Sequence, residues 1–168
     1  MRDLTRANAR KAAWEELTEA GFRVFTPLVW KVRMNGNRKE RFRTPAIHDL
    51  LFVDSTRELL DPEVEIRPTL QYRFVRGGGY REAMTVPDRD MERFILAASS
   101  GDDPRYFLPS ELTPSMIGRE VRIVGGPLDG FTGHLLSLRG TRTRRLIVEL
   151  PGMLTSVIEV SPDYVQLV

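Results

Sequence analysis

Side chains that could perform acid-base, metal or phosphate chemistry are few and scattered in this sequence. There is no cysteine, and His48 and His134 are the only two histidines. Two separated histidines without a nucleophile motif make a poor metal or catalytic site. The acidic pairs Glu15-Glu16 and Asp102-Asp103 are expected to be solvated, and Gly77-Gly78-Gly79 lacks the Lys-Ser/Thr of a phosphate-binding loop. The sequence therefore predicts no enzyme, no metal and no cofactor.

Basic residues, by contrast, are concentrated near the start of the chain. Residues 1–50 carry 11 lysines and arginines against 6 acids, whereas residues 51–113 carry 8 against 12. Arginine's planar fork suits phosphates and base edges, which favours a nucleic-acid partner. Arg2, Arg6, Arg10 and Lys11 would line one face of a predicted helix and are the candidate nucleic-acid-binding residues. The alternative is a solvated helix face.

The first hundred residues read as a mixture of helices and antiparallel strands. Apolar residues at helical spacing predict a helix from Leu4 to Ala20, ended by Gly21. A second helix is predicted from Pro87 to about Ala98. Strands are expected at 22–25, 50–53 and 71–76, and a basic hairpin at 30–34 and 38–42 turns at Asn35-Gly36-Asn37.

A change of composition divides the chain after this region. Prolines and Gly101 between residues 101 and 113 predict a linker, so residues 1–100 and 114–168 are expected to form separate domains. The second domain contains short alternating segments separated by glycine and proline turns, at 120–124, 133–138, 145–150, 156–160 and 165–168. Closely spaced short strands of this kind predict a small β-barrel. The fold class is therefore α+β.

The most specific motif is the stretch Val121-Arg122-Ile123-Val124-Gly125-Gly126-Pro127-Leu128-Asp129-Gly130-Phe131-Thr132-Gly133. It resembles a KOW motif, which implies an SH3-like barrel. Its glycines would let a strand turn tightly and place Phe131 on an exposed loop. The predicted partner-binding residues of this loop are Pro127, Gly130, Phe131 and Gly133.

The order of elements before this motif is similar to the NGN domain of NusG-type transcription factors, an α/β sandwich with a mainly antiparallel sheet. Phe25-Thr26-Pro27 resembles the family's exit from its first helix and strand. Ile47-His48-Asp49-Leu50 departs from the usual pattern in the direction of the UpxY branch, as do Thr85-Val86-Pro87-Asp88 and Leu112-Thr113-Pro114. The family's domain begins with a strand, whereas this chain is expected to enter its first helix directly, so that strand is predicted to be missing.

The resemblance implies a transcription elongation or antitermination factor that binds the clamp helices of the RNA polymerase largest subunit. The implied effect is greater processivity, and for the UpxY branch transcription of long polysaccharide operons. By matched position, the predicted polymerase-binding residues are Phe25, Pro27, Ile47, His48, Leu50 and Met91. The basic helix face would contact non-template DNA or nascent RNA, and the KOW domain would reach a small-subunit ribosomal protein or Rho.

Two alternatives come from other classes of protein. A ribosome-associated RNA-binding protein would also carry a KOW motif, but it is usually more basic than the net charge of +2 found here. A small enzyme would need convergent titratable groups in a pocket, which the sequence does not indicate.

No apolar run approaches the roughly 20 residues that a membrane-spanning helix needs. Together with the lack of cysteine, this predicts a cytoplasmic protein without a membrane partner.

Overall fold

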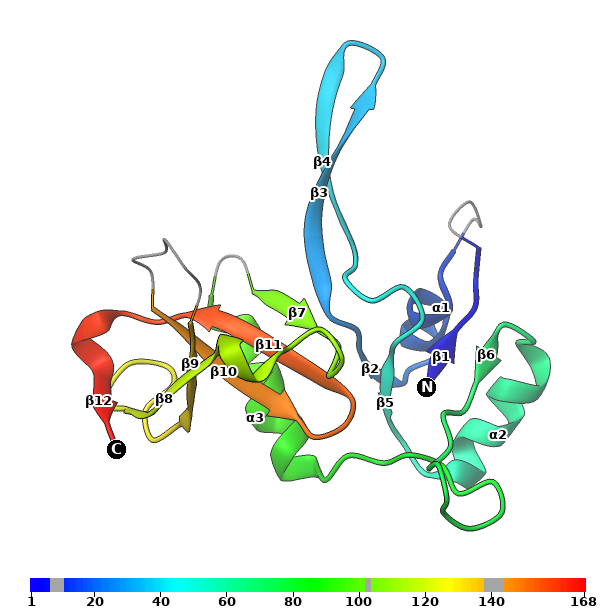
Figure 1. Ribbon diagram of the computed structural model, residues 1–168. Coiled ribbons are helices and arrows are strands. Elements are labelled where there is room, and N and C mark those ends of the chain that lie inside the picture. The colour runs from blue at the N-terminus through cyan, green and yellow to red at the C-terminus, as the bar shows by residue number, and fades with distance from the viewer. Residues whose placement is uncertain (7–10, 102–103, 138–143) are drawn as a thin grey trace. The chain divides into compact units, whose positions relative to one another are not determined.

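The computed structural model describes residues 1–6, 11–101, 104–137 and 144–168. It divides into two compact units, Met1–Thr85 and Val86–Val168, which are described separately (Figure 1). Both mix helix with antiparallel strand pairs, and the described residues contain three α-helices. The α+β character expected from the sequence is therefore present.

The first unit is built from three strand pairs and two helices. Its elements are β1 (Arg2–Asp3), α1 (Ala13–Glu19), β2 (Arg23–Phe25), β3 (Leu28–Asn35), β4 (Arg38–Pro45), β5 (Phe52–Asp54), α2 (Arg57–Ile66) and β6 (Leu70–Gln71). The pairs β1–β6, β2–β5 and β3–β4 are all antiparallel. Ala13 and Leu17 of α1 pack with Leu60 of α2, and Leu51 and Leu70 complete this buried core.

The prediction that the chain enters its first helix directly is wrong. Residues 2 and 3 form β1, and the pairing with the β6 region continues through the Leu4 amide, which donates to Thr69 O at 2.8 Å. On the other side, the Leu51 amide donates to Met1 O at 3.3 Å. A short strand therefore precedes α1 and lies between two other segments of the unit.

The first helix also begins later than predicted, at Ala13 instead of Leu4. Asp3 explains the start, because its buried carboxylate accepts hydrogen bonds from the amides of Thr5 at 2.9 Å and Ala13 at 3.1 Å. A carboxylate at this end satisfies a free helix N–H and suits the positive end of the helix dipole. The Glu15 carboxylate likewise accepts from the Ala12 amide at 3.0 Å.

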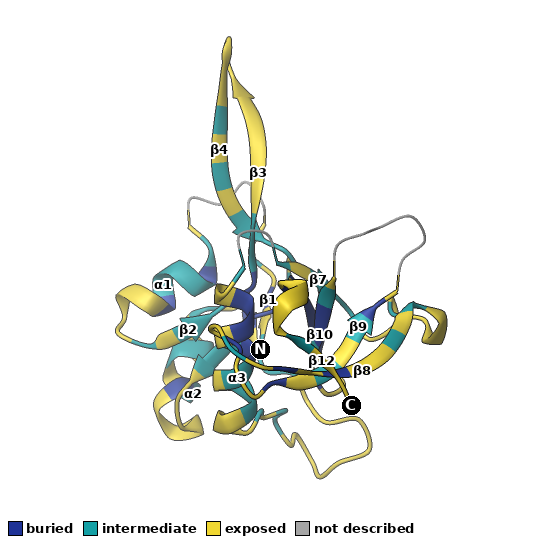
Figure 2. Cartoon of the chain, turned by 90° about the vertical axis from the view of Figure 1, so that its left-hand side faces the viewer, coloured by how far each residue is buried: buried dark blue, intermediate teal, exposed yellow. Residues whose placement is uncertain are grey.

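A long hairpin, β3–β4, extends from the first unit (Figure 1). Its eight cross-strand pairs run from Leu28↔Pro45 to Asn35↔Arg38, and a two-residue turn at Gly36-Asn37 joins them. Gly36 has φ +59°, a conformation that glycine adopts without strain. Most of the hairpin is exposed (Figure 2).

The second unit is a six-stranded antiparallel sheet covered by a helix. Its elements are α3 (Asp88–Ser99), β7 (Arg105–Phe107), η1 (Pro114–Met116), β8 (Ile117–Ile123), β9 (Thr132–Leu136), β10 (Arg145–Leu150), β11 (Leu154–Glu159), η2 (Pro162–Tyr164) and β12 (Val165–Leu167). The strand order is β12-β8-β9-β10-β11-β7. All five segments predicted for this region coincide with strands, although several ends differ by a few residues.

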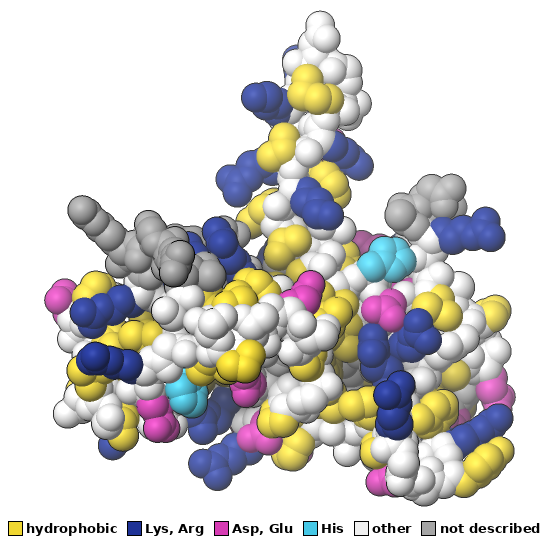
Figure 3. Space-filling view, in the orientation of Figure 1, with side chains coloured by type: hydrophobic (Ala, Val, Ile, Leu, Met, Phe, Trp, Pro, Cys, Tyr) yellow, Lys and Arg dark blue, Asp and Glu magenta, His cyan; other side chains and the backbone are white. Residues whose placement is uncertain are grey.

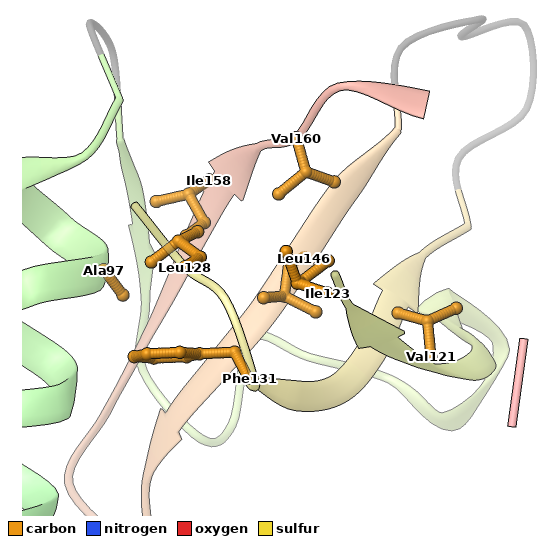
Figure 4. Packing of buried hydrophobic residues seen from close by; sticks show 8 residues of the cluster. All are labelled: Ala97, Val121, Ile123, Leu128, Phe131, Leu146, Ile158 and Val160. Carbon is orange, nitrogen blue, oxygen red and sulfur yellow. The ribbon is translucent and has the colours of Figure 1, made fainter. Parts of the chain in front are cut away.

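Helix α3 packs on this sheet through its buried face. Ala97 belongs to one core cluster with Leu128, Phe131 and Ile158 (Figure 4). Phe94 is fully buried, and its ring centroid lies 6.4 Å from that of Tyr106. The sequence had grouped α3 with residues 1–100 and treated 101–113 as a linker. Instead, residues 105–107 pair with β11, and α3 and β7 both lie in the second compact unit.

Candidate functional site

Two segments of the first unit that were predicted to bind polymerase lie side by side. The Ala46 amide donates to Pro27 O at 2.7 Å, and the Thr26 hydroxyl donates to Leu50 O at 3.0 Å. A further bond from the Leu50 amide to Ile47 O, at 3.3 Å, closes a turn within the second segment. The structure therefore brings residues 25–27 and 46–50 together, as a shared surface requires.

The residues of this surface differ in what they can offer a partner. Phe25 and Ile47 are half-buried and His48 is exposed, so these three side chains are accessible. Pro27 and Leu50 are buried, and only 4% of Leu50 is exposed. The prediction that Pro27 and Leu50 contact a partner is therefore wrong, because both side chains are buried. We call Phe25 and Ile47, together with the neighbouring imidazole of His48, the apolar patch.

Asp49 anchors the second segment in a way that the sequence analysis missed. Its carboxylate pairs with Arg2 at 3.1 Å and with Arg73 at 3.2 Å, and Arg73 also donates to Asp49 O at 3.3 Å. These contacts tie residue 49 to β1 and to the chain after β6. The sequence analysis missed these ion pairs because they join residues that are far apart in the chain; 24 positions separate Asp49 from Arg73.

Met91, the last of the predicted polymerase-binding residues, is half-buried on α3, which belongs to the second unit. Its predicted polymerase contact stays a prediction.

The three described residues of the predicted basic helix face, Arg2, Arg6 and Lys11, do not lie on a helix. Arg2 lies in β1 and pairs with Asp49, and Arg6 precedes α1 without being helical. Lys11, also outside the helix, pairs with Glu19, which raises the pKa of this lysine. Arg10 lies outside the described residues. The four-residue spacing of Arg2 and Arg6 has no helical meaning, because residues 2 and 3 form a strand and residues 4–6 are not helical.

The glycine-rich motif forms the loop between β8 and β9, and its phenylalanine points inward. Phe131 is 7% exposed and packs with Ala97 and Leu128 (Figure 4). The Arg93 guanidinium lies 4.7 Å from its ring centroid. The prediction that Phe131 is an exposed contact residue is therefore wrong. A large aromatic next to a sheet gains more from burial than from solvent exposure.

The other three motif residues that were predicted to bind a partner differ in their surroundings. Pro127 and Gly130 are exposed on the loop, where Gly130 has φ +79°. Gly133 is half-buried in β9, and a β-carbon there would lie 2.7 Å from Ile147 O. Gly133 is thus explained by close strand packing, whereas Pro127 and Gly130 remain available to a partner.

Most of the exposed lysines and arginines among the described residues 1–50 lie on the hairpin β3–β4. Arg33 pairs with Glu40 at 2.9 Å, and this hydrogen bond lowers the pKa of the Glu40 carboxyl. The sequence identified the hairpin as basic but assigned it no role. Along β3 the cations Lys31 and Arg33 alternate with apolar side chains, and β4 adds four more cations. Cationic and apolar side chains are thus mixed along the hairpin (Figure 3).

Neither a metal cluster nor a membrane helix is found in the part of the chain that the structure describes. No three histidine or acidic side chains there are grouped to hold an ion. No helix there is long and apolar enough to span a bilayer.

Comparison with known proteins gives one family. No curated protein matches the chain. The family described as "Transcription termination factor nusG" matches residues 4–95, which run through the first unit and into α3 and make up more than half of the 168 residues. Proteins of this family are transcription factors rather than enzymes, and they generally bind RNA polymerase. The chain belongs to the NusG family.

Proposed function

We propose that this protein is a transcription elongation factor that docks on the clamp helices of RNA polymerase through the apolar patch. The observation that carries the proposal is the hydrogen-bonded juxtaposition of residues 25–27 and 46–50. It places Phe25, Ile47 and His48 where their side chains are accessible. Apolar groups left accessible on a folded surface are typical of a protein-protein contact.

The support beneath the patch suits such a contact. Pro27 and Leu50 are buried, and Asp49 is held by two arginines, so the segment is fixed before a partner arrives. A preorganised surface loses little conformational entropy on binding. Docking at the clamp helices would hold the clamp closed and thereby raise processivity, without any bond chemistry.

Three finer assignments belong to the same proposal. The sequence pattern at residues 47–50 supports assignment to the UpxY branch, whose targets would be long polysaccharide operons. The six-stranded sheet of the second unit would be a KOW domain. Its loop, with Pro127 and Gly130 exposed, would contact a small-subunit ribosomal protein or Rho.

The test is binding of the full chain to core RNA polymerase, measured for Ile47→Asp. A carboxylate placed in a desolvated apolar contact costs on the order of 2 kcal/mol or more, which corresponds to about 30-fold weaker binding. The matched control is Ile66→Asp, because Ile66 ends α2 and is 69% exposed. The control is expected to bind like the parent.

Circular dichroism of both variants establishes that they fold. If folded Ile47→Asp binds core polymerase as tightly as Ile66→Asp does, then the apolar patch is not the polymerase contact.

A further inference from the structure

The hairpin β3–β4 carries an excess of positive charge that its own ion pairs do not neutralise. Among its residues, the basic side chains outnumber the acidic ones by six to one: Lys31, Arg33, Arg38, Lys39, Arg41 and Arg43 against Glu40. Glu40 is already paired with Arg33 at 2.9 Å. Five cations therefore remain without an acidic partner on the hairpin. Each of them lies opposite an apolar or amide side chain, so the hairpin tolerates them without direct repulsion across the strands. They remain available to an anionic partner.

The cations lie on both faces of the hairpin. Cross-strand pairing aligns Trp30 with Arg43, Val32 with Arg41 and Met34 with Lys39, so these six side chains share one face. The opposite face carries the other three cations, Lys31, Arg33 and Arg38. A flat anionic surface would need cations on one face only. Positive charge on both faces fits a partner that presents anions on two sides.

The apolar residues of the first face are unusually exposed. Trp30 is 50% exposed, Val32 60% and Met34 62%. The guanidinium groups of Arg41 and Arg43 lie 5.0 and 5.6 Å from the Trp30 ring, a cation-π arrangement that restrains both arginines. The face therefore combines positioned cations with apolar groups that could contact sugars or thymine methyl groups.

We propose that the hairpin is an arm that enters the major groove of B-form duplex DNA. That groove is about 12 Å wide and admits a two-stranded β-ribbon, with a row of phosphates on each side. The deep, narrow major groove of an A-form RNA duplex does not admit one. The cations of the two faces would contact the two phosphate rows, while Trp30, Val32 and Met34, which share a face with Lys39, Arg41 and Arg43, would contact the sugars along one of these rows.

This inference goes beyond the proposed polymerase contact and is tested without polymerase. Fluorescence anisotropy of the full chain is measured with a labelled 20-base-pair DNA duplex, an RNA duplex of the same length and single-stranded DNA, over a range of salt concentrations. We expect the DNA duplex to bind at least fivefold more tightly than the other two.

The decisive variant replaces the three cations of the Trp30 face: Lys39→Gln, Arg41→Gln and Arg43→Gln. Each lost phosphate contact reduces the slope of log K against log salt by about 0.9, so the slope should fall by up to about 2.7. Affinity for the DNA duplex should fall at least tenfold. The matched control carries Arg76→Gln, Arg105→Gln and Arg119→Gln, which removes three exposed cations elsewhere and should change affinity by less than twofold.

Equal losses for the two triple variants would overturn the proposal, because they would mean that only net charge matters. No binding of duplex DNA at low salt, or tighter binding of the RNA duplex or the single strand, would overturn it as well. If the hairpin triple variant does not fold, Arg38→Gln with Lys39→Gln near the turn gives the same test, with an expected slope change of about 1.8. Polymerase binding is measured separately on each variant and should be retained.

Discussion

At the scale of single residues, Gly133 shows how closely two strands can approach. It lies in β9 opposite β10, and a β-carbon at this position would come within 2.7 Å of Ile147 O. The obstacle is backbone in the middle of a sheet, which cannot move aside as a flexible side chain could. No unusual backbone angle is involved, so the need for glycine at this position comes from packing alone.

We therefore expect Gly133→Ala to destabilise the second unit. Overpacking at a rigid site costs about 1–3 kcal/mol, and thermal melting followed by circular dichroism should show a lowered midpoint. Gly101→Ala is the matched control, because a β-carbon at Gly101 meets nothing within 4 Å and the residue has no positive φ. If Gly133→Ala melts at the same temperature as Gly101→Ala, then β9 and β10 can move apart without a loss of stability.

Residue types alone did not decide which motif residues face a partner. Phe131 stands in a glycine-rich turn that predicts exposure, yet it is buried against α3, and Pro27 and Leu50 are buried beneath the apolar patch. The resemblance to the NGN domain, by matched position, was sufficient to place residues 25–27 and 46–50 in one region. The direction of each side chain depends on contacts between distant segments, which one sequence does not display.

At the scale of elements, helix α2 forms although local sequence patterns do not indicate it. The sequence analysis did not identify this helix, and it contains Pro62 in its interior, which ordinarily disfavours helix. Packing compensates, since Leu60 is 5% exposed within the core of the first unit. Arg67, just after the helix, pairs with Glu16 of α1 and with Glu63 and adds a polar link to α1.

Leu60→Ala should accordingly destabilise the first unit. Truncating a buried leucine costs about 2–5 kcal/mol through lost burial and the cavity left behind. Leu59→Ala makes the same change on the same helix at a residue that is 65% exposed, so it should cost less than about 0.5 kcal/mol. Chemical denaturation of the full chain measures both. Similar midpoints for the two variants would argue that α2 is not docked on the core.

Elements with a strong local signal were predicted well. The strand Arg145–Leu150 has the bounds expected from its alternating pattern, and α3 begins and ends within one residue of its predicted limits. The hairpin turn at Gly36-Asn37 was likewise evident from the sequence. The errors fall where tertiary contacts decide, as at α1, whose start is set by Asp3 from β1.

At the scale of the whole molecule, the two compact units do not follow the change in composition along the chain. The prolines and Gly101 predicted a linker at 101–113, but residues 105–107 extend the sheet and α3 covers it. The family match itself ends at residue 95, inside α3. Composition identifies stretches that cannot be helical, whereas membership of a unit depends on which apolar faces meet.

The position of α3 leads to a prediction about fragments. A fragment of residues 86–168 retains the helix, whereas one of residues 101–168 lacks it and would expose Phe131 and Leu128, which pack with Ala97 in the same cluster. Exposing apolar area costs roughly 25 cal/mol per Å². The longer fragment should therefore melt cooperatively at a higher temperature than the shorter one in differential scanning calorimetry.

A point variant separates the loss of packing from a mere effect of length. In the fragment of residues 86–168, Phe94→Ala should cost about 3–5 kcal/mol, because Phe94 is fully buried, while Leu96→Ala on the same helix should cost far less, because Leu96 is 47% exposed. Both changes leave the chain length unaltered. Equal melting temperatures for the two fragments, together with a Phe94→Ala variant as stable as Leu96→Ala, would show that α3 is not part of the second folding unit and would support the boundary near residue 100 expected from composition.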